Sequence, residues 1–113
     1  MHQTLIIARM EPSHAPDVAA AFAESDAGEL PGLLGVAERR LFRFHDLYVH
    51  MISSDGPMAD RVDAVRSHPA FTEVNSRLAR YITAYDPPSW SGPRDAMAQE
   101  FYSWSPGRAA GGR

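Results

Sequence analysis

Arg39 and His50 are the residues whose types and spacing in this sequence suggest shared chemistry. They flank the dipeptide His45-Asp46, which lies between two runs of strand-forming residues and predicts a hairpin turn. With a two-residue turn there, Arg39 and His50 become diagonal neighbours, roughly 7–8 Å apart at the backbone. An imidazole transfers protons near neutral pH, and a guanidinium stabilises an oxyanion. Both side chains can therefore reach one small ligand.

Side chains alternate along strands, so the predicted hairpin has two distinct faces. The register pairs Phe44 with Leu47, Arg43 with Tyr48, Leu41 with His50 and Arg39 with Ile52. One face then carries Arg39, Leu41, Arg43, Tyr48, His50 and Ile52, and the other carries Arg40, Phe42, Phe44, Leu47, Val49 and Met51. The first of these, the mixed face, combines charged and apolar residues. Two interpretations stay open for it, namely a solvated sheet surface or the wall of a cavity covered by helices. In the second, the apolar face is buried against a partner.

The elements that must position this pair follow the order β-α-β-β-α(α)-β. The predicted elements are a strand at 3–10, a helix capped by Ser13 and ending near Asp26, a long hairpin over 30–54, helices at 55–68 and 70–82 separated at Pro69, a loop at 86–95 and a last strand at 97–105. This order predicts an α+β, ferredoxin-like βαββαβ fold, with a four-stranded antiparallel sheet and helices on one face. Residues 1–105 form the single predicted domain, and 106–113 a disordered tail. Because one sheet face stays bare, we expect a homodimer of the dimeric α/β-barrel type.

Composition excludes several function classes. The net charge of −3 argues against nucleic-acid binding, which needs a basic surface. The chain has no Cys, which removes disulfides, thiolate metal sites and cysteine nucleophiles, and its five histidines lack metal-site spacing. It shows neither an apolar run of membrane-spanning length nor a signal peptide, so we expect a soluble cytoplasmic protein without metal or membrane contact.

Four segments carry a resemblance to a known family. They are AAAFAESDAGELP, LFRFHDLYVHMI, RSHPAFTEVNSRLARYI and EFYSW, and the likeness runs from about Leu5 to Trp104. The chain resembles the tetracenomycin-type polyketide cyclases, which act on aromatic (type II) polyketides. The resemblance implies a homodimeric ferredoxin-like fold, a pocket within each subunit and no cofactor. It also implies an aromatase/cyclase that closes a ring on an aromatic polyketide in antibiotic or pigment biosynthesis, with other polyketide synthase components as further partners.

The same resemblance implies which residues act. The family's catalytic positions fall on Asp26 at the helix end and on Arg39 and His50 in the hairpin. For substrate binding we expect Ser25, Phe22, Tyr48, Arg43 and Trp104. Relatives can carry a histidine immediately before this aspartate, where this chain has Ser25. A proton-carrying role there would pass to Asp26, His50 or a water, or the chain would close a different ring.

Aldol-type closure of a poly-β-ketone needs a base, a group that holds the enolate and an acid, and loss of water then gives the ring. The sequence does not assign base and acid among Asp26, His50 and water. Structural alternatives also stay open: Asp26 as a solvated turn residue, Arg39 paired with Glu38 or Glu29, and His50 as a structural histidine. Two other functions remain open as well, a cofactor-free polyketide monooxygenase and a non-catalytic binding partner of a synthase complex.

Overall fold

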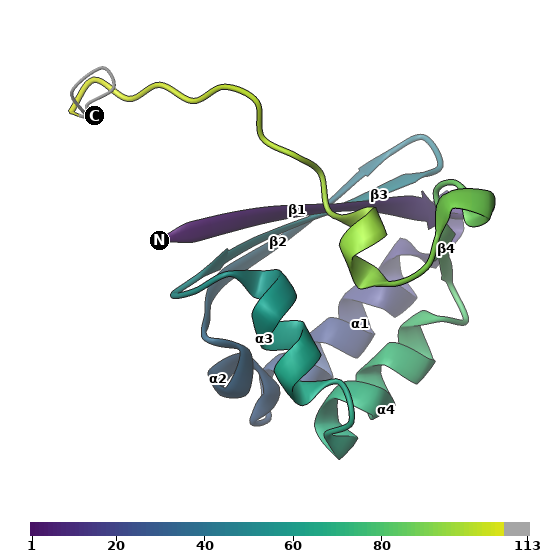
Figure 1. Ribbon diagram of the computed structural model, residues 1–113. Helices are drawn as coiled ribbons and strands as arrows, with labels where there is room; N and C mark the ends of the chain where they lie inside the picture. The colour runs from purple at the N-terminus through teal and green to yellow at the C-terminus, as the bar shows by residue number, and fades with distance from the viewer. Residues whose placement is uncertain (108–113) are drawn as a thin grey trace.

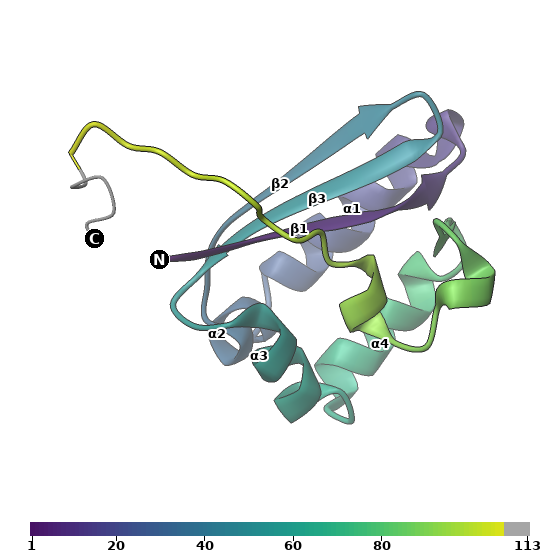
Figure 2. The same ribbon diagram turned by 45° about the horizontal axis from the view of Figure 1, so that its top comes forward.

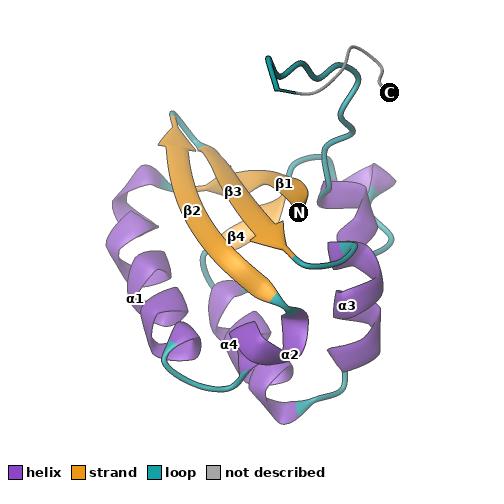
Figure 3. Cartoon of the chain, turned by 90° about the vertical axis from the view of Figure 1, so that its left-hand side faces the viewer, coloured by secondary structure: helices purple, strands orange, loops and turns teal. Residues whose placement is uncertain are grey.

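The computed structural model describes residues 1–107 and has two layers, a four-stranded antiparallel sheet and a set of helices against one of its faces (Figures 1 and 3). The strands are β1 (His2–Met10), β2 (Val36–Phe44), β3 (Leu47–Ser54) and β4 (Ile82–Ala84), in the spatial order β2-β3-β1-β4. The helices are α1 (Ala15–Asp26), α2 (Leu30–Leu34), α3 (Met58–Val65) and α4 (Pro69–Leu78), with short 3-10 turns at Pro12–His14, Pro87–Ser89 and Pro93–Ala96. This arrangement confirms the predicted ferredoxin-like fold.

The β2–β3 hairpin has the predicted register. Leu41 lies opposite His50, Arg39 opposite Ile52, and Phe44 opposite Leu47 around a two-residue turn. His45 in that turn has a φ of 56°, in the left-handed region that a two-residue hairpin turn requires. Every residue of the hairpin from Glu38 onward therefore lies on the face that its alternation predicts.

The core lies between the helices and the inner face of the sheet, which is the face that the helices cover. Apolar residues spaced by three or four positions on α1, α3 and α4 point at the strands. Two clusters fill this layer, one around Leu30, Leu34, Ile52, Met58, Val62 and Val74, and the other around Ala8, Met10, Val18, Phe22 and Tyr48. The mixed face of the hairpin is thus the buried one, and its interpretation as a solvated surface is wrong.

Three predicted elements differ from the structure. The segment 97–105 is not a strand, apart from a single bridge between Met97 and Ile6. The fourth strand is β4, whose first residue the prediction placed at the end of a helix and whose other two it assigned to no element. The short helix α2 replaces the start of the predicted long hairpin and ends at Gly35, which has a φ of 69°. Helix α1 begins after His14 instead of Ser13, because a 3-10 turn occupies Pro12–His14.

The outer face of the sheet, opposite the helices, is largely uncovered (Figure 2). Its exposed apolar side chains include Leu5, Phe42 and Phe44. After Ala98, whose N–H donates to the carbonyl of Leu5, the chain leaves the domain as an extended segment (Figure 1). Most of the predicted tail, residues 108–113, lies outside the described residues. Within residues 1–107 no helix has both the length and the apolar character that a membrane crossing needs.

Candidate active site

Helix α1 places an aromatic ring and a carboxylate beside the hairpin. Val18, Phe22 and Asp26 are spaced by four residues, which puts them on one face of the helix. Val18 and Phe22 are buried against the sheet, whereas Asp26 lies in the last turn at the edge of the core. The helix therefore anchors itself through its apolar residues and presents the carboxylate to the start of β2.

Arg39 on β2 lies between Asp26 and His50. Its Nε and Nη2 donate to the Asp26 carboxylate at 3.0 and 2.8 Å, a bidentate geometry, and its Nη1 lies 2.9 Å from His50 Nε2. The Arg39 side chain is 10 % exposed, against 37 % for Asp26. A guanidinium carries five N–H donors, and these contacts use about three of them. Arg39 can therefore still donate to a ligand oxyanion while it is held in place.

The alternative partners for Arg39 are occupied elsewhere. Glu38 accepts a hydrogen bond from Arg40 at 2.8 Å, and Glu29 lies 3.7 Å from His68 Nε2. Asp26 is not a simple solvated turn residue either, because its carboxylate is the partner of Arg39. The structure thus brings together Asp26, Arg39 and His50, the residues to which the resemblance assigned catalysis.

His50 on β3 is a buried histidine whose environment favours the neutral ring. Burial, with the nearby Arg39 charge as a second cause, lowers the pKa of His50 to about 3. The Phe22 ring meets His50 edge-on at 5.0 Å between centroids, and the Arg39 guanidinium lies 4.8 Å from the centre of the same ring. At neutral pH the imidazole is therefore an uncharged hydrogen-bonding group, already engaged by Arg39, and not a ready proton donor.

Tyr48 ends the row of polar contacts on the inner face. It lies two residues before His50 on β3, is 4 % exposed, and its hydroxyl lies 3.0 Å from His50 Nδ1. Burial raises the pKa of Tyr48, opposed in part by the Arg39 charge, so the phenol keeps its proton. The hairpin alternation places Tyr48 and His50 on one face, but the direct contact between them was not predicted.

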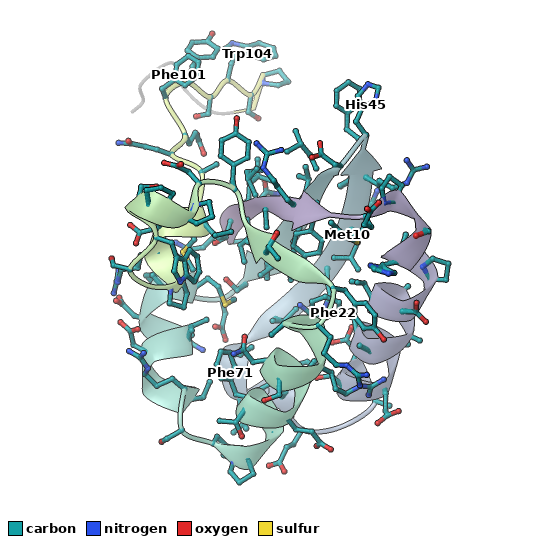
Figure 4. All side chains as sticks on the ribbon, turned by 90° about the vertical axis from the view of Figure 1, so that its right-hand side faces the viewer. Met10, Phe22, His45, Phe71, Phe101 and Trp104 are labelled. Carbon is teal, nitrogen blue, oxygen red and sulfur yellow. The ribbon has the colours of Figure 1, made fainter. Side chains whose placement is uncertain are left out.

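The residues expected to bind substrate fall into two groups. Phe22 and Tyr48 are part of the buried row, and Ser25 is half-buried on α1 beside Asp26. Arg43 is exposed near the hairpin turn. Trp104 is 68 % exposed on the C-terminal segment, and Figure 4 shows it far from Phe22. Within one subunit, Trp104 therefore does not join the other predicted residues.

Other places in the described chain offer less chemistry. A hollow of about 60 Å³ lies near Ile7, Tyr85 and Trp90, far below the roughly 300 Å³ at which small-molecule pockets begin. Among residues 1–107, no three His, Asp or Glu side chains gather as metal ligands would. The row from Asp26 to Tyr48 is therefore the candidate active site.

The chain is similar to known proteins at two levels. At the level of fold, the chain is similar to a Chloroflexus aurantiacus protein assigned to antibiotic biosynthesis monooxygenases, with 17 % identity, a TM-score of 0.51 and coverage of 75 % of this chain and 86 % of that one. At the level of family, the model for "Polyketide synthesis cyclase" matches residues 2–105. The chain belongs to the polyketide synthesis cyclase family.

Individual relatives agree with this assignment. The chain is 48 % identical to tetracenomycin F2 cyclase of Streptomyces glaucescens, over 92 % of this chain and 94 % of that protein, and the solved structure of that type-II polyketide cyclase superposes with a TM-score of 0.87 over 93 % and 98 %. It is also 45 % identical to polyketide synthase CurG of Streptomyces cyaneus (92 % and 97 % covered) and 54 % identical to an uncharacterized protein of Streptomyces coelicolor (92 % and 95 %). The protein is therefore a polyketide cyclase, similar over nearly its whole length to tetracenomycin F2 cyclase.

Proposed function

We propose that this enzyme closes a ring of an aromatic polyketide intermediate by a cofactor-free, aldol-type condensation followed by dehydration, in an antibiotic or pigment pathway. The proposal rests on one observation above all. A buried arginine is held by a carboxylate and an imidazole and keeps donors free, in a chain 48 % identical to tetracenomycin F2 cyclase. A group of this kind suits a reaction in which negative charge develops on oxygen.

The reaction asks for three operations on the substrate. A base removes a proton from a carbon between two carbonyls, which forms an enolate. The enolate carbon attacks a second carbonyl carbon, a C–C bond forms, and the attacked oxygen takes up a proton. That hydroxyl then leaves as water together with a second C–H proton, which gives the ring its new double bond. Arg39 is suited to the charge on oxygen in the first two steps.

The environments of the two proton-transfer candidates differ, and this difference supports a division of roles. Asp26 is the partly solvent-exposed group, and we assign it the base, acting directly or through a water. His50 is buried with a lowered pKa, and we assign it the orientation of Arg39. Ser25, next to Asp26, can donate a hydrogen bond to a phenol or quinone oxygen of the substrate. The Phe22 ring contacts His50 edge-on and lies against the Arg39 guanidinium. Holding the substrate in one reactive conformation contributes to the rate in addition to these proton transfers.

We further propose that the outer face of the sheet is the interface of a homodimer. Phe42 is 51 % and Phe44 65 % exposed, both on β2, where Arg39 and Leu41 on the inner face are partly buried. Contiguous exposed apolar surface of this kind marks association sites in proteins. Pairing two such faces would bury both, which is the arrangement of a dimeric α/β barrel.

In the decisive experiment, the purified enzyme is incubated with tetracenomycin F2, the compound after which its relative is named, and with open-chain aromatic polyketides. Mass spectrometry follows the loss of one water, and an oxygen electrode runs in parallel. A cyclase accelerates water loss without consuming O₂, whereas O₂ uptake coupled to product would support a monooxygenase instead. Arg39→Met and Asp26→Asn should slow the reaction while remaining folded. Unchanged product yield and rate in both variants would support a non-catalytic binding role.

A further inference from the structure

The row of contacts on the inner face fixes where the proton of His50 lies. A guanidinium has donors but no acceptor, so His50 Nε2, 2.9 Å from Arg39 Nη1, must be the nitrogen with the free lone pair. The proton of the neutral ring is then on Nδ1. The Tyr48 hydroxyl lies 3.0 Å from that nitrogen, so its oxygen accepts the hydrogen bond.

We propose that Tyr48 is a positioning residue for Arg39, acting through His50: by accepting from Nδ1–H it fixes the ring tautomer whose Nε2 can accept from the guanidinium. This inference rests on the proposed function, in which Arg39 stabilises the developing oxyanion. Tyr48 was expected to bind substrate, and this role is a different one. It requires no contact between Tyr48 and the reacting atoms.

The tautomer of His50 matters for the position of Arg39 because both His50 and Tyr48 are buried. Tyr48 and His50 are 4 % and 5 % exposed, which leaves little room for water to replace a missing partner. Without the Tyr48 oxygen, the neutral ring either keeps a buried Nδ1–H without this acceptor or moves its proton to Nε2. In the second case two donors face each other at the Arg39 contact. The second outcome loosens the guanidinium from its place between Asp26 and His50, and the first removes the hydrogen bond that holds the ring in position.

The first test reads the tautomer directly in the unmodified enzyme. Nitrogen-15 NMR of labelled histidine at pH 7 should show His50 with a protonated Nδ1 and an unprotonated Nε2. A protonated Nε2 in the wild-type enzyme would overturn the proposal. This measurement uses neither a variant nor a substrate, so it can overturn the proposal even if Tyr48→Phe fails to fold.

The second test is kinetic and uses the same reaction as above. Tyr48→Phe should lower kcat by about tenfold with KM nearly unchanged, the scale expected for one hydrogen bond lost from an oriented set. In an Arg39→Met background the same change should have no further effect on kcat, because both substitutions act through the guanidinium. The matched control is Tyr81→Phe, which removes a hydroxyl from a ring packed on the same core cluster and should leave kcat unchanged.

The outcomes separate the two proposals. If Arg39→Met loses rate while Tyr48→Phe keeps it, the positioning role of Tyr48 is wrong and the proposed function stands. If Tyr48→Phe lowers kcat equally in the wild-type and Arg39→Met backgrounds, Tyr48 acts independently of Arg39, which also overturns the inference. If Arg39→Met keeps full activity, the proposed function loses its central residue, and the positioning role of Tyr48, which acts through Arg39, is overturned with it even if NMR shows the expected tautomer.

Discussion

The two faces of the β2–β3 hairpin reverse the usual distribution of polar and apolar side chains. On the inner face, the polar groups of Arg39, Tyr48 and His50 lie buried under α1. On the outer face, Phe42 and Phe44 are more than half exposed. Exposed single apolar residues are common in proteins, but a buried polar row and a contiguous exposed apolar patch are the informative exceptions. One strand pair thus carries both a candidate active site and a candidate interface, separated only by the alternation of its side chains.

The largest effect is expected from a substitution of Arg39, at the centre of the polar row on the inner face. Arg39→Met should lower kcat/KM for ring closure about 100-fold, the cost typical of losing one preorganised oxyanion donor. Steady-state kinetics at pH 7 measures it, with circular dichroism to verify the fold. Arg94→Gln is the matched control, because Arg94 also binds two carboxylates, Asp60 and Asp63, but does so on the exposed surface. Equal losses in both variants would contradict the assignment of Arg39.

The next effect concerns acid stability. The folded state holds the pKa of His50 at about 3, below the value of 6.5 for a free histidine, so the unfolded state binds the proton first as pH falls. The stability that the neutral ring contributes is therefore complete above about pH 6.5 and declines below it, by about 2 kcal/mol at pH 5. His50→Gln lacks this titration. Urea unfolding at pH 8 and pH 5 should show the wild-type enzyme losing about that much more than the variant, and parallel losses would contradict the burial effect.

A third prediction tests the outer face. Phe42→Ser combined with Phe44→Ser should weaken self-association about tenfold or more, because both rings would lie in the core of the proposed interface. Sedimentation equilibrium measures the association. Leu33→Ser is the control, since Leu33 is 39 % exposed on α2, on the helix side of the sheet. A pair variant that associates as strongly as the wild type would place the interface elsewhere.

The smallest effect is expected at the exposed ion pairs. Hydrogen bonds and ion pairs to Asp63 and Asp60 raise the pKa of Arg94, yet all three side chains are well exposed and screened by water. Arg94→Gln should therefore leave the urea midpoint nearly unchanged. A large drop in that midpoint would show that ion pairs on this surface matter as much as the buried pair of Arg39.

The hairpin could be predicted from the sequence because two local rules determine it. A two-residue turn and a side-chain period of two place Arg39 and His50 together on one face, and the structure has that register. The spacing of Val18, Phe22 and Asp26 likewise fixes one face of α1. What the sequence left open was whether helices or water cover that face, which depends on packing between distant segments.

The fourth strand shows where local rules fail. Ile82–Ala84 is too short to display alternation, and Tyr81 and Ile82 continue the helical spacing of Phe71, Val74 and Leu78. The segment 97–105 is rich in strand-forming aromatic residues, but in this subunit only Met97 bridges to β1. Helix α2 was missed for a related reason, since Pro31 and Gly32 are typical of loops. In each case tertiary contacts decided between patterns that the local sequence leaves nearly equal.

The hydrogen-bonded row from Asp26 to Tyr48 is exposed to solvent at one end and buried at the other. Solvent reaches the carboxylate, while the imidazole and the phenol are sealed beneath α1. Under the proposed function, protons exchanged with the bulk during turnover would enter and leave at the carboxylate. The last turn of α1, which carries Asp26, is therefore where this row of side chains meets the solvent.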